Sequence, residues 1–168
     1  LVTGSGRNIG RAIILRLASD GADVVVNART NEAEAQAVAG EARALGVRAT
    51  AILADVADRE QVDAMVGAAI AEWGRIDILV NNAGIVGRDV PVKDLTEDDW
   101  DTVLDINLKG VFLCSRSVIG HMMEQGKGSI CSVASVSGKE GNPNMTPYSV
   151  SKAGVICFTK ALAKEVLD

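Results

Sequence analysis

The stretch that decides the fold is Thr3-Gly4-Ser5-Gly6-Arg7-Asn8-Ile9-Gly10. It follows the apolar pair Leu1-Val2 and precedes a run in which apolar residues recur at helical spacing. A strand that enters a glycine-rich turn and then a helix offers bare backbone N–H groups and a helix N-terminus to a pyrophosphate. Three residues separate Gly6 from Gly10, so the spacing differs from the common G-x-G-x-x-G. A tight strand-to-helix connection without a ligand is the alternative interpretation.

The rest of the chain alternates short apolar runs with longer helical ones. This alternation is typical of β-α-β units, in which a parallel sheet carries helices on both faces. Each short run is predominantly apolar, as a strand covered on both faces requires. We therefore predict an α/β fold of the Rossmann type, a doubly wound parallel sheet. The predicted strands are Val24–Val26, Ala49–Ala54, Ile78–Asn81 and Ser129–Val133.

Three capping patterns and three glycines mark the ends of the predicted helices. Each pattern places Asn, Asp or Thr three positions before an acid or an amide, which is a signature of helix N-termini. The third pattern predicts one long helix toward Met122, and a fifth helix is expected to begin near Tyr148 and to run to the end of the chain. The patterns are Asn31-x-x-Glu34, Asp58-x-x-Gln61 and Thr96-x-x-Asp99, and the glycines are Gly21, Gly46 and Gly74.

Composition narrows the function classes. With 168 residues, 48% of them apolar, the chain can form a single domain with a sizeable core. A net charge of −5 without a cluster of Lys or Arg argues against nucleic acid and anionic membranes as partners. No apolar run approaches the roughly 20 residues that span a bilayer. Cys114, Cys131 and Cys157 lie far apart without C-x-x-C spacing, which argues against a metal site and favours free, buried thiols in a reducing cytoplasm.

Both ends of the chain look incomplete. Leu1-Val2 is too short for a strand and the sequence does not begin with Met, so we expect the first strand to begin upstream. The chain stops inside or just after a helix, which would leave Ser129–Val133 as the bare edge of an apolar parallel sheet. We therefore expect the native protein to continue past Asp168.

The end of the predicted strand Val24–Val26 bears on the choice of cofactor. A carboxylate at this position would bind the ribose 2′-OH of NAD and repel a 2′-phosphate. The sequence has Asn27-Ala28-Arg29 instead, and Arg7 in the first turn could approach the same place. Two cations and no carboxylate favour NADP(H) over NAD(H). The alternative is that both arginines lie in solvent.

Two further segments follow predicted strands at the edge of the sheet where ligands bind. The small residues in Asn81-Asn82-Ala83-Gly84 would let a cofactor lie against the end of their strand. Paired Asn residues can also simply close a turn. Asp55 follows the strand Ala49–Ala54 and could accept a hydrogen bond from adenine, although a helix-capping role fits it equally well.

A phenol, an ammonium and a hydroxyl are predicted to meet at one cleft. Tyr148 and Lys152 stand four residues apart at the start of a helix and therefore share a face. An ammonium beside a phenol favours the phenolate, so the phenol can give or take a proton. Ser135 follows Ser129–Val133, and its hydroxyl could polarise a carbonyl oxygen that the phenol protonates. Taken alone, Tyr148 and Lys152 also fit a surface pair on an amphipathic helix.

Together these pieces resemble the short-chain dehydrogenases/reductases, and the closest likeness is to their 3-oxoacyl-[acyl-carrier-protein] reductase branch. The pieces occur in the family's order, at spacings typical of its single-domain members, and they cover essentially the whole chain. The resemblance implies one NAD(P)-binding domain over residues 1–168. The matching pieces are Thr3-Gly4…Gly10, Asp55-Val56, Asn81-Asn82-Ala83-Gly84, Asn107, Ser135 and Tyr148-x-x-x-Lys152.

The resemblance also implies a role for each residue. Tyr148 would be the acid/base, and Lys152 would favour its phenolate and hydrogen-bond the nicotinamide ribose. Ser135 would polarise the substrate carbonyl, and Asn107 would hold a water for proton relay. Asn8 stands where the family has its middle glycine, and Asn tolerates positive φ better than most residues. The cofactor-binding residues would be Thr3, Gly4, Ser5, Arg7, Asn8, Ile9, Gly10, Asn27, Arg29, Asp55, Val56, Asn82, Ala83, Gly84, Tyr148 and Lys152.

Three functions remain open at this stage. The first is an NADP(H)-dependent reductase of a small-molecule carbonyl, free or linked to an acyl carrier. The second is a sugar or polyol dehydrogenase of the same family, which would share every motif. The third is a nucleotide-binding regulator without catalysis, which the intact Ser135, Tyr148, Lys152 and Asn107 argue against. A homodimer or homotetramer is expected to form through the segments Trp100–Met122 and Tyr148–Leu167.

Overall fold

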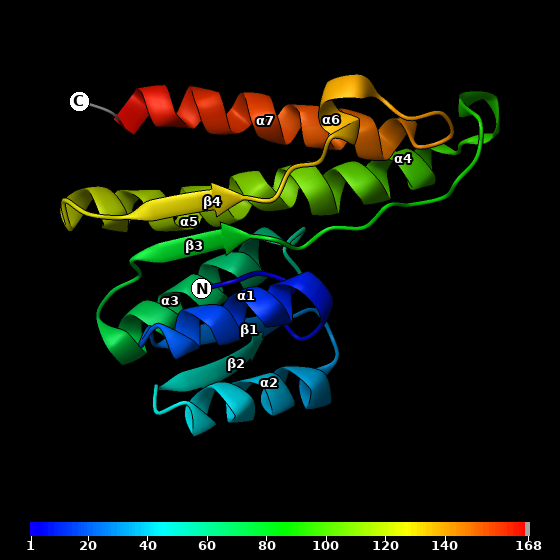
Figure 1. The fold of residues 1–168 in the computed structure, drawn as a ribbon. Helices are drawn as coiled ribbons and strands as arrows, with labels where there is room; N and C mark the ends of the chain where they lie inside the picture. The colour runs from blue at the N-terminus through cyan, green and yellow to red at the C-terminus, as the bar shows by residue number, and fades with distance from the viewer. Residues whose placement is uncertain (167–168) are drawn as a thin grey trace.

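A parallel sheet forms the centre of the molecule in the computed structural model, which describes residues 1–166. Strand β1 (Val24–Ala28) pairs with β2 (Ala49–Leu53), and β3 (Ile78–Asn81) pairs with β4 (Ser129–Ser132). Val2 joins the two halves by parallel bridges to Val26 of β1 and Val80 of β3. The order across the sheet is therefore β2, β1, Val2, β3 and β4, and the predicted strands are confirmed (Figure 1).

Helices cover both faces of this sheet, as the doubly wound prediction requires (Figure 1). On one face, α1 and α2 bury Ile14 and Val38 against Val26. On the other face, α3 and α5 bury Val62 and Leu113 around Leu79. The helical elements are α1 (Asn8–Ser19), α2 (Glu32–Ala44), α3 (Arg59–Trp73), the 3-10 turn Val92–Asp94, α4 (Glu97–Leu104), the π-helical turn Asp105–Lys109, α5 (Gly110–Glu124), α6 (Ser137–Glu140) and α7 (Thr146–Val166).

The three predicted capping patterns are present at the starts of α2, α3 and α4. The side chain of Asn31 accepts a hydrogen bond from the backbone N–H of Glu34 at 3.1 Å. The carboxylate of Asp58 accepts from the backbone of α3 in the same way. Thr96 and Asp99 form the full reciprocal capping box. Each cap pairs backbone N–H groups that have no partner inside the helix, and this fixes where the helix begins.

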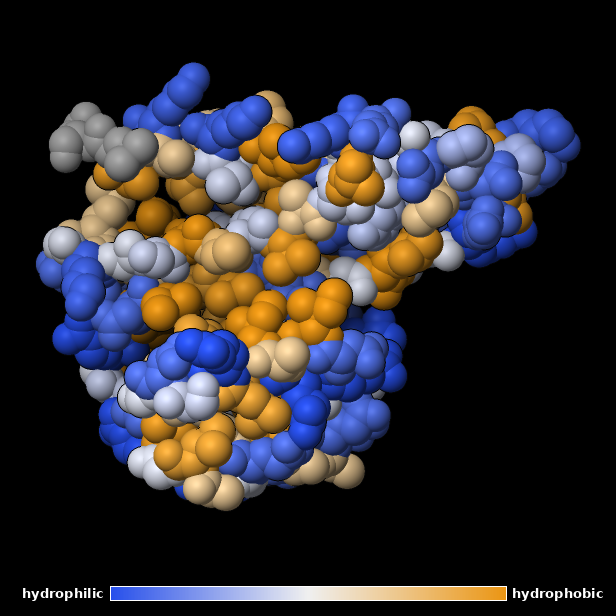
Figure 2. Space-filling model, viewed as in Figure 1, coloured by the Kyte–Doolittle hydropathy of each residue, from blue (hydrophilic) through white to orange (hydrophobic). Residues whose placement is uncertain are grey.

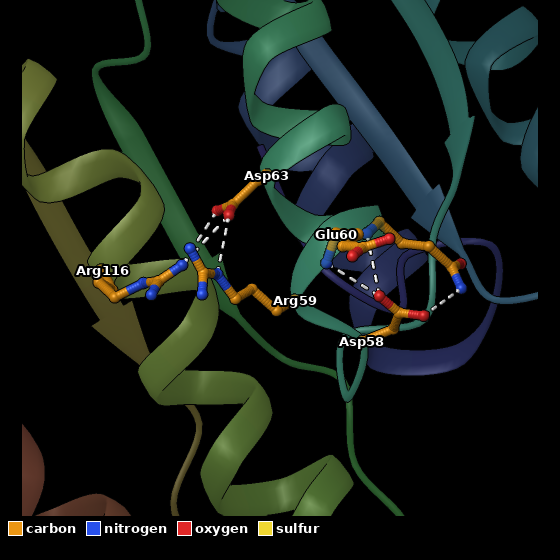
Figure 3. Close-up of polar contacts among 6 residues, drawn as sticks. Asp58, Arg59, Glu60, Asp63 and Arg116 are labelled. Carbon is orange, nitrogen blue, oxygen red and sulfur yellow. Dashed lines mark hydrogen bonds and ion pairs between the residues drawn. The ribbon is translucent and has the colours of Figure 1, made fainter.

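Charged side chains connect α3 to α5 next to the Asp58 cap (Figure 3). The carboxylate of Asp63 lies 3.5 Å from Arg59 of its own helix and 3.2 Å from Arg116 of α5. All three side chains are well exposed, so each pair contributes roughly 0–1 kcal/mol at most. The buried apolar contacts between the helices therefore stabilise this packing more than the ion pairs do.

The single long helix predicted from Thr96 toward Met122 is interrupted. A π-helical turn, Asp105–Lys109, separates α4 from α5. A π turn adds one residue to the helical repeat, and it leaves no signature in an apolar pattern that is read at a period of 3.6. Two short elements, α6 and the 3-10 turn Val92–Asp94, were also not predicted.

The last predicted helix begins two residues earlier than expected. Helix α7 starts at Thr146 rather than near Tyr148, so Pro147 lies in its first turn, where a missing N–H costs nothing. The expectation that this helix runs to the end of the chain concerns Leu167 and Asp168, which lie outside the described residues.

The three cysteines are free, but only one is buried. Cys114 lies inside the α3–α5 face of the sheet, and burial raises the pKa of its thiol to about 12. Cys131 and Cys157 are exposed, which corrects the expectation of buried thiols. Cys131 belongs to the edge strand β4, where one face lacks a covering element, and Cys157 lies on an exposed position of α7.

Within the described residues β4 pairs with β3 alone, so it forms the edge that the sequence predicted. A groove of about 580 Å³ lies beside this edge, between the end of α5, β4 and α7. Figure 2 shows apolar side chains gathered in the hollow below α7. Among residues 1–166, no helix has the length and apolar character needed to cross a membrane.

Candidate functional site

The glycine-rich turn before α1 has a conformation that depends on its glycines. Gly4 has a φ of +62°, a left-handed conformation that favours glycine. A Cβ added to Gly10 would lie 2.4 Å from the carbonyl oxygen of Gly4 and 2.7 Å from Cα of Ser5. Because real Cβ atoms do not approach backbone so closely, Gly10 allows the helix to start directly against the turn.

The N-terminus of α1 is open, unlike those of α2, α3 and α4. Arg7 occupies the capping position and its side chain makes no capping hydrogen bond. Asn8 has a φ of +50°, which confirms that Asn adopts the left-handed conformation where the family has glycine. Arg7, Asn8 and Ile9 are all exposed, and Ile9 is 65% accessible. The turn therefore presents backbone N–H groups and a cation to solvent, which suits a phosphate.

Thr3 and Asn82 attach the turn to the segment after β3. The hydroxyl of Thr3, which is 1% exposed, accepts hydrogen bonds from the backbone N–H groups of Asn82 and Ala83, both at 3.0 Å. In return, Nδ2 of Asn82 donates to the carbonyls of Thr3 and Gly4. These side chains hold two predicted cofactor segments together.

Ser5 and Asn27 are buried inside the turn, with 0% and 1% of their surface exposed. Oγ of Ser5 donates to the carbonyl of Val2 at 2.7 Å and accepts from the backbone N–H of Asn27 at 3.1 Å. Neither side chain faces outward as a cofactor ligand would. Both residues therefore stabilise the turn from within, which the sequence pattern alone did not predict.

Arg29 and Asp55 meet at the open end of β1 and β2. Their closest charged atoms lie 4.0 Å apart, and the Arg29 side chain remains 63% exposed. Asp55 also accepts a hydrogen bond from the backbone N–H of Ala57, as a turn residue would. Val56 is buried, and a Cβ added to Gly110 would meet it at 2.9 Å. The structure thus brings an exposed cation, weakly paired, and the predicted adenine ligand to one place.

Tyr148 and Lys152 lie one above the other in the first turns of α7. Nζ of Lys152 lies 5.8 Å from the centroid of the Tyr148 ring. The ammonium donates a hydrogen bond to the carbonyl of Val133 at 2.7 Å, just past the end of β4. Lys152 is only 5% exposed, and burial holds its pKa below the ordinary value. Lys152 is therefore held inside the protein beside a half-buried Tyr148, which argues against a solvated surface pair.

Asn107 lies in the π-helical turn and is fully buried. Its Nδ2 donates to the carbonyl of Ile85 and to Oγ of Ser151, and its Oδ1 accepts from the N–H of Ile85. Both amide hydrogens are used, so neither remains to bind a relay water. Ser151 also donates to the carbonyl of Tyr148 at 2.7 Å. Ser151 is a site residue that the sequence pattern did not single out, although its position three residues after Tyr148 permits this bond.

Gly84 connects the cofactor segments to the catalytic ones. A Cβ added to Gly84 would lie 3.1 Å from Oδ1 of Asn107 and 3.5 Å from Nζ of Lys152. The end of β3, the π turn and α7 therefore meet at this glycine. Any side chain at this position would enter the space in front of the Lys152 ammonium.

Ser135 lies in the segment between β4 and α7, two residues beyond the carbonyl that holds Lys152. Its Oγ accepts a hydrogen bond from the backbone N–H of Ser137, and the residue is half-buried. The segment packs tightly on α7, because a Cβ on Gly138 would lie 2.6 Å from the carbonyl carbon of Lys152. The structure thus places Ser135 at the carboxyl end of β4, as expected, with its hydroxyl hydrogen free to donate.

The candidate residues line neither of two cavities among the described residues. The 580 Å³ groove lies along β4 and the far half of α7, and a second cavity of about 360 Å³ surrounds Trp100 and Thr146. The candidate site instead lies at the carboxyl ends of the strands, where the connecting loops meet. In residues 1–166 no group of three or more His, Cys, Asp or Glu side chains is placed to hold a metal ion.

The sequence matches a known protein family along its whole length. The family model described as short chain dehydrogenase matches residues 1–168. The chain is 45% identical over 166 residues to 3-oxoacyl-[acyl-carrier-protein] reductase FabG of Staphylococcus aureus, and this match covers 99% of the chain and 67% of that protein. The chain thus spans about two thirds of the length of this relative.

Solved structures agree with this match. NAD+-bound xylitol dehydrogenase superposes with a TM-score of 0.95 at 37% identity, over 99% of this chain and 64% of that one. A variant of actinorhodin polyketide ketoreductase with NADPH gives 0.93 at 40% identity, over 98% and 63%. The likeness confirms the Rossmann-type fold. The chain belongs to the short-chain dehydrogenase family, whose members are oxidoreductases that act on CH–OH and C=O groups with NAD(P).

Proposed function

We propose that this protein is an NADP(H)-dependent reductase of a small carbonyl compound, of the 3-oxoacyl reductase type. The observation that carries the proposal is the position of the buried Lys152 ammonium. It lies 5.8 Å from the centroid of the Tyr148 ring and next to Gly84, where the lack of a side chain leaves space in front of it. The 45% identity to a 3-oxoacyl-[acyl-carrier-protein] reductase supports the substrate class. The glycine cradle, with its open helix N-terminus and two exposed arginines, fits a dinucleotide.

The chain's own residues supply the proton and the orientation. Tyr148 donates the proton of its hydroxyl to the carbonyl oxygen while the carbonyl carbon accepts a hydride, which NADPH supplies when bound. The resulting phenolate is stabilised by the ammonium of Lys152. Ser135 donates a hydrogen bond to the same carbonyl oxygen and polarises it. Asn107 acts indirectly. Its side chain connects the loop at Ile85 to Ser151 of the helix that carries Tyr148.

The first test is a titration of the protein with NADPH and NADH, followed by a substrate screen. Nicotinamide fluorescence should show tighter binding of NADPH, and a 3-oxoacyl thioester should be reduced faster than any sugar is converted. Faster oxidation of pentitols with NAD+ would favour a polyol dehydrogenase, to which the xylitol dehydrogenase likeness points. Binding without turnover of any carbonyl would favour a regulator.

Arg29 is expected to carry much of the preference for NADPH. Arg29→Ala should weaken NADPH binding by about tenfold, which is the loss of one charge-assisted hydrogen bond, and should leave NADH binding within about twofold. The Arg29 side chain is 63% exposed, so it is free to contact the 2′-phosphate of a nucleotide bound beside Asp55. Arg48→Ala is the matched control, since Arg48 is equally exposed but pairs with Asp23 at 2.6 Å. An equal loss for both nucleotides in Arg29→Ala would contradict the assignment.

We also propose that residues 1–168 form one NAD(P)-binding domain in a cytoplasmic protein that assembles as a homodimer or homotetramer. Apolar side chains remain exposed along the helices expected to pair. Phe112 of α5 is 44% exposed and meets Phe158 of α7 edge-on at 6.4 Å. Light scattering should give the mass of a dimer or tetramer, and Phe112→Glu should lower it. A monomeric wild type would contradict this proposal.

A further inference from the structure

Asn27, at the end of β1, uses its whole side chain within the protein. Its Oδ1 accepts a hydrogen bond from the backbone N–H of Gly4 at 3.1 Å. Its Nδ2 donates to the carbonyl of Ala54 at 3.1 Å and to that of Ile52 at 3.3 Å. Only 1% of the residue is exposed. A buried amide that is satisfied in this way is held rigidly, because breaking its bonds would leave polar groups buried without their partner.

These contacts connect three separate segments of the candidate cofactor site. Gly4 belongs to the glycine-rich turn, and Ala54 directly precedes Asp55 at the end of β2. Asn27 itself lies two residues before Arg29. The backbone of Asn27 adds two bonds to the turn, one in each direction, with Ser5. One residue thus sets the spacing between the phosphate turn and the edge that carries Arg29 and Asp55.

We infer that Asn27 is a positioning residue that holds the glycine-rich turn and the Arg29–Asp55 edge in register for nucleotide binding, and that it does not touch the nucleotide itself. The inference rests on the proposed function. It corrects the expectation that Asn27 is a direct ligand, since its polar atoms already have partners and almost none of its surface is accessible. Gly4 is the sensitive point, because glycine has the most backbone freedom to lose and its N–H donates the hydrogen bond that Oδ1 of Asn27 accepts.

The test replaces Asn27 by a side chain of similar size without polar atoms. Asn27→Leu should weaken the binding of NADPH and NADH alike, by about tenfold, and should raise KM for the nucleotide more than it lowers kcat. The amide of Gly4 should exchange its hydrogen faster in the absence of nucleotide. Val62→Ala is the control: it removes buried volume from α3, on the face of the sheet opposite to α1, and should lower stability without changing either dissociation constant.

A second variant separates a positioning role from direct contact. Asn27→Asp should leave NADPH as the preferred nucleotide, because a buried carboxyl cannot reach a ribose. A switch to NADH would show that the side chain faces the ribose and would overturn the inference. Unchanged affinities in Asn27→Leu together with a lowered melting temperature would reduce Asn27 to a stabilising residue and would also overturn it.

The proposed function can fail separately from this inference. If the wild-type protein binds neither nucleotide, the proposed function is wrong. Hydrogen exchange at Gly4 then still decides whether Asn27 holds the turn, and unchanged exchange in Asn27→Leu would refute the inference in either case.

Discussion

Tyr148→Phe is expected to lower kcat by roughly 10²- to 10⁴-fold, the usual contribution of a positioned acid/base. The change removes one oxygen and keeps the ring that packs beside Lys152 at 5.8 Å. The Lys152 ammonium also keeps its bond to the carbonyl of Val133, so the local structure should persist. Single-turnover reduction with saturating NADPH measures the chemical step directly.

Nucleotide affinity is the internal control for this variant. The dissociation constant for NADPH should stay within about twofold, because the phenol oxygen acts on the substrate. The chain contains one tyrosine, so no neighbouring phenol can replace it. Activity within tenfold of the wild type would end the assignment of Tyr148 as the acid/base.

Gly10→Ala is expected to weaken NADPH binding by about 100-fold, roughly the loss of two charge-assisted hydrogen bonds from a displaced phosphate-binding turn. The new methyl group would lie 2.4 Å from the carbonyl oxygen of Gly4 and 2.6 Å from Nδ2 of Asn82. Backbone must therefore move, and the overpacking should cost about 1–3 kcal/mol of stability. Fluorescence titration and thermal unfolding measure the two effects.

Gly67→Ala is the matched control for Gly10→Ala. Gly67 also lies in a helix, but nothing stands within 4 Å of its added Cβ. The same chemical change should there raise stability by about 0.5–1 kcal/mol, since alanine restricts the unfolded chain, and leave affinity unchanged. If Gly10→Ala bound NADPH as tightly as Gly67→Ala, the glycine-rich turn would not be the phosphate site.

Elements with strong local signals could be predicted from the sequence. The strands are short apolar runs between turn residues, and the caps at Asn31, Asp58 and Thr96 form hydrogen bonds within one helical turn. Such signals involve residues that are close in sequence, so one chain contains all the information. The π-helical turn at Asp105–Lys109 has no such signal, because it depends on packing between α4, α5 and α7.

In the candidate site, too, contacts within one helix could be predicted and contacts between distant segments could not. Tyr148 and Lys152 could be paired from their spacing alone, because a helix sets their distance. The roles of Asn27 and Asn107 could not, because their partners Gly4 and Ile85 lie 23 and 22 residues away. An asparagine that binds a ligand and one that ties two loops together look the same in a sequence. Only burial and hydrogen-bond partners distinguish them.

The central place of Val2 in the sheet has a consequence for folding. The segment around Val2 forms the middle of the sheet, yet it needs β3 to do so, because the nitrogen of Leu1 donates a hydrogen bond to the carbonyl of Ile78, 77 residues further along the chain. Closing so long a loop costs entropy before any contact compensates for it, which slows folding. Until then β1 and β2 form one separate half with exposed apolar edges. Weakening the Val2 bridges should therefore slow folding and favour aggregation before it alters the finished site.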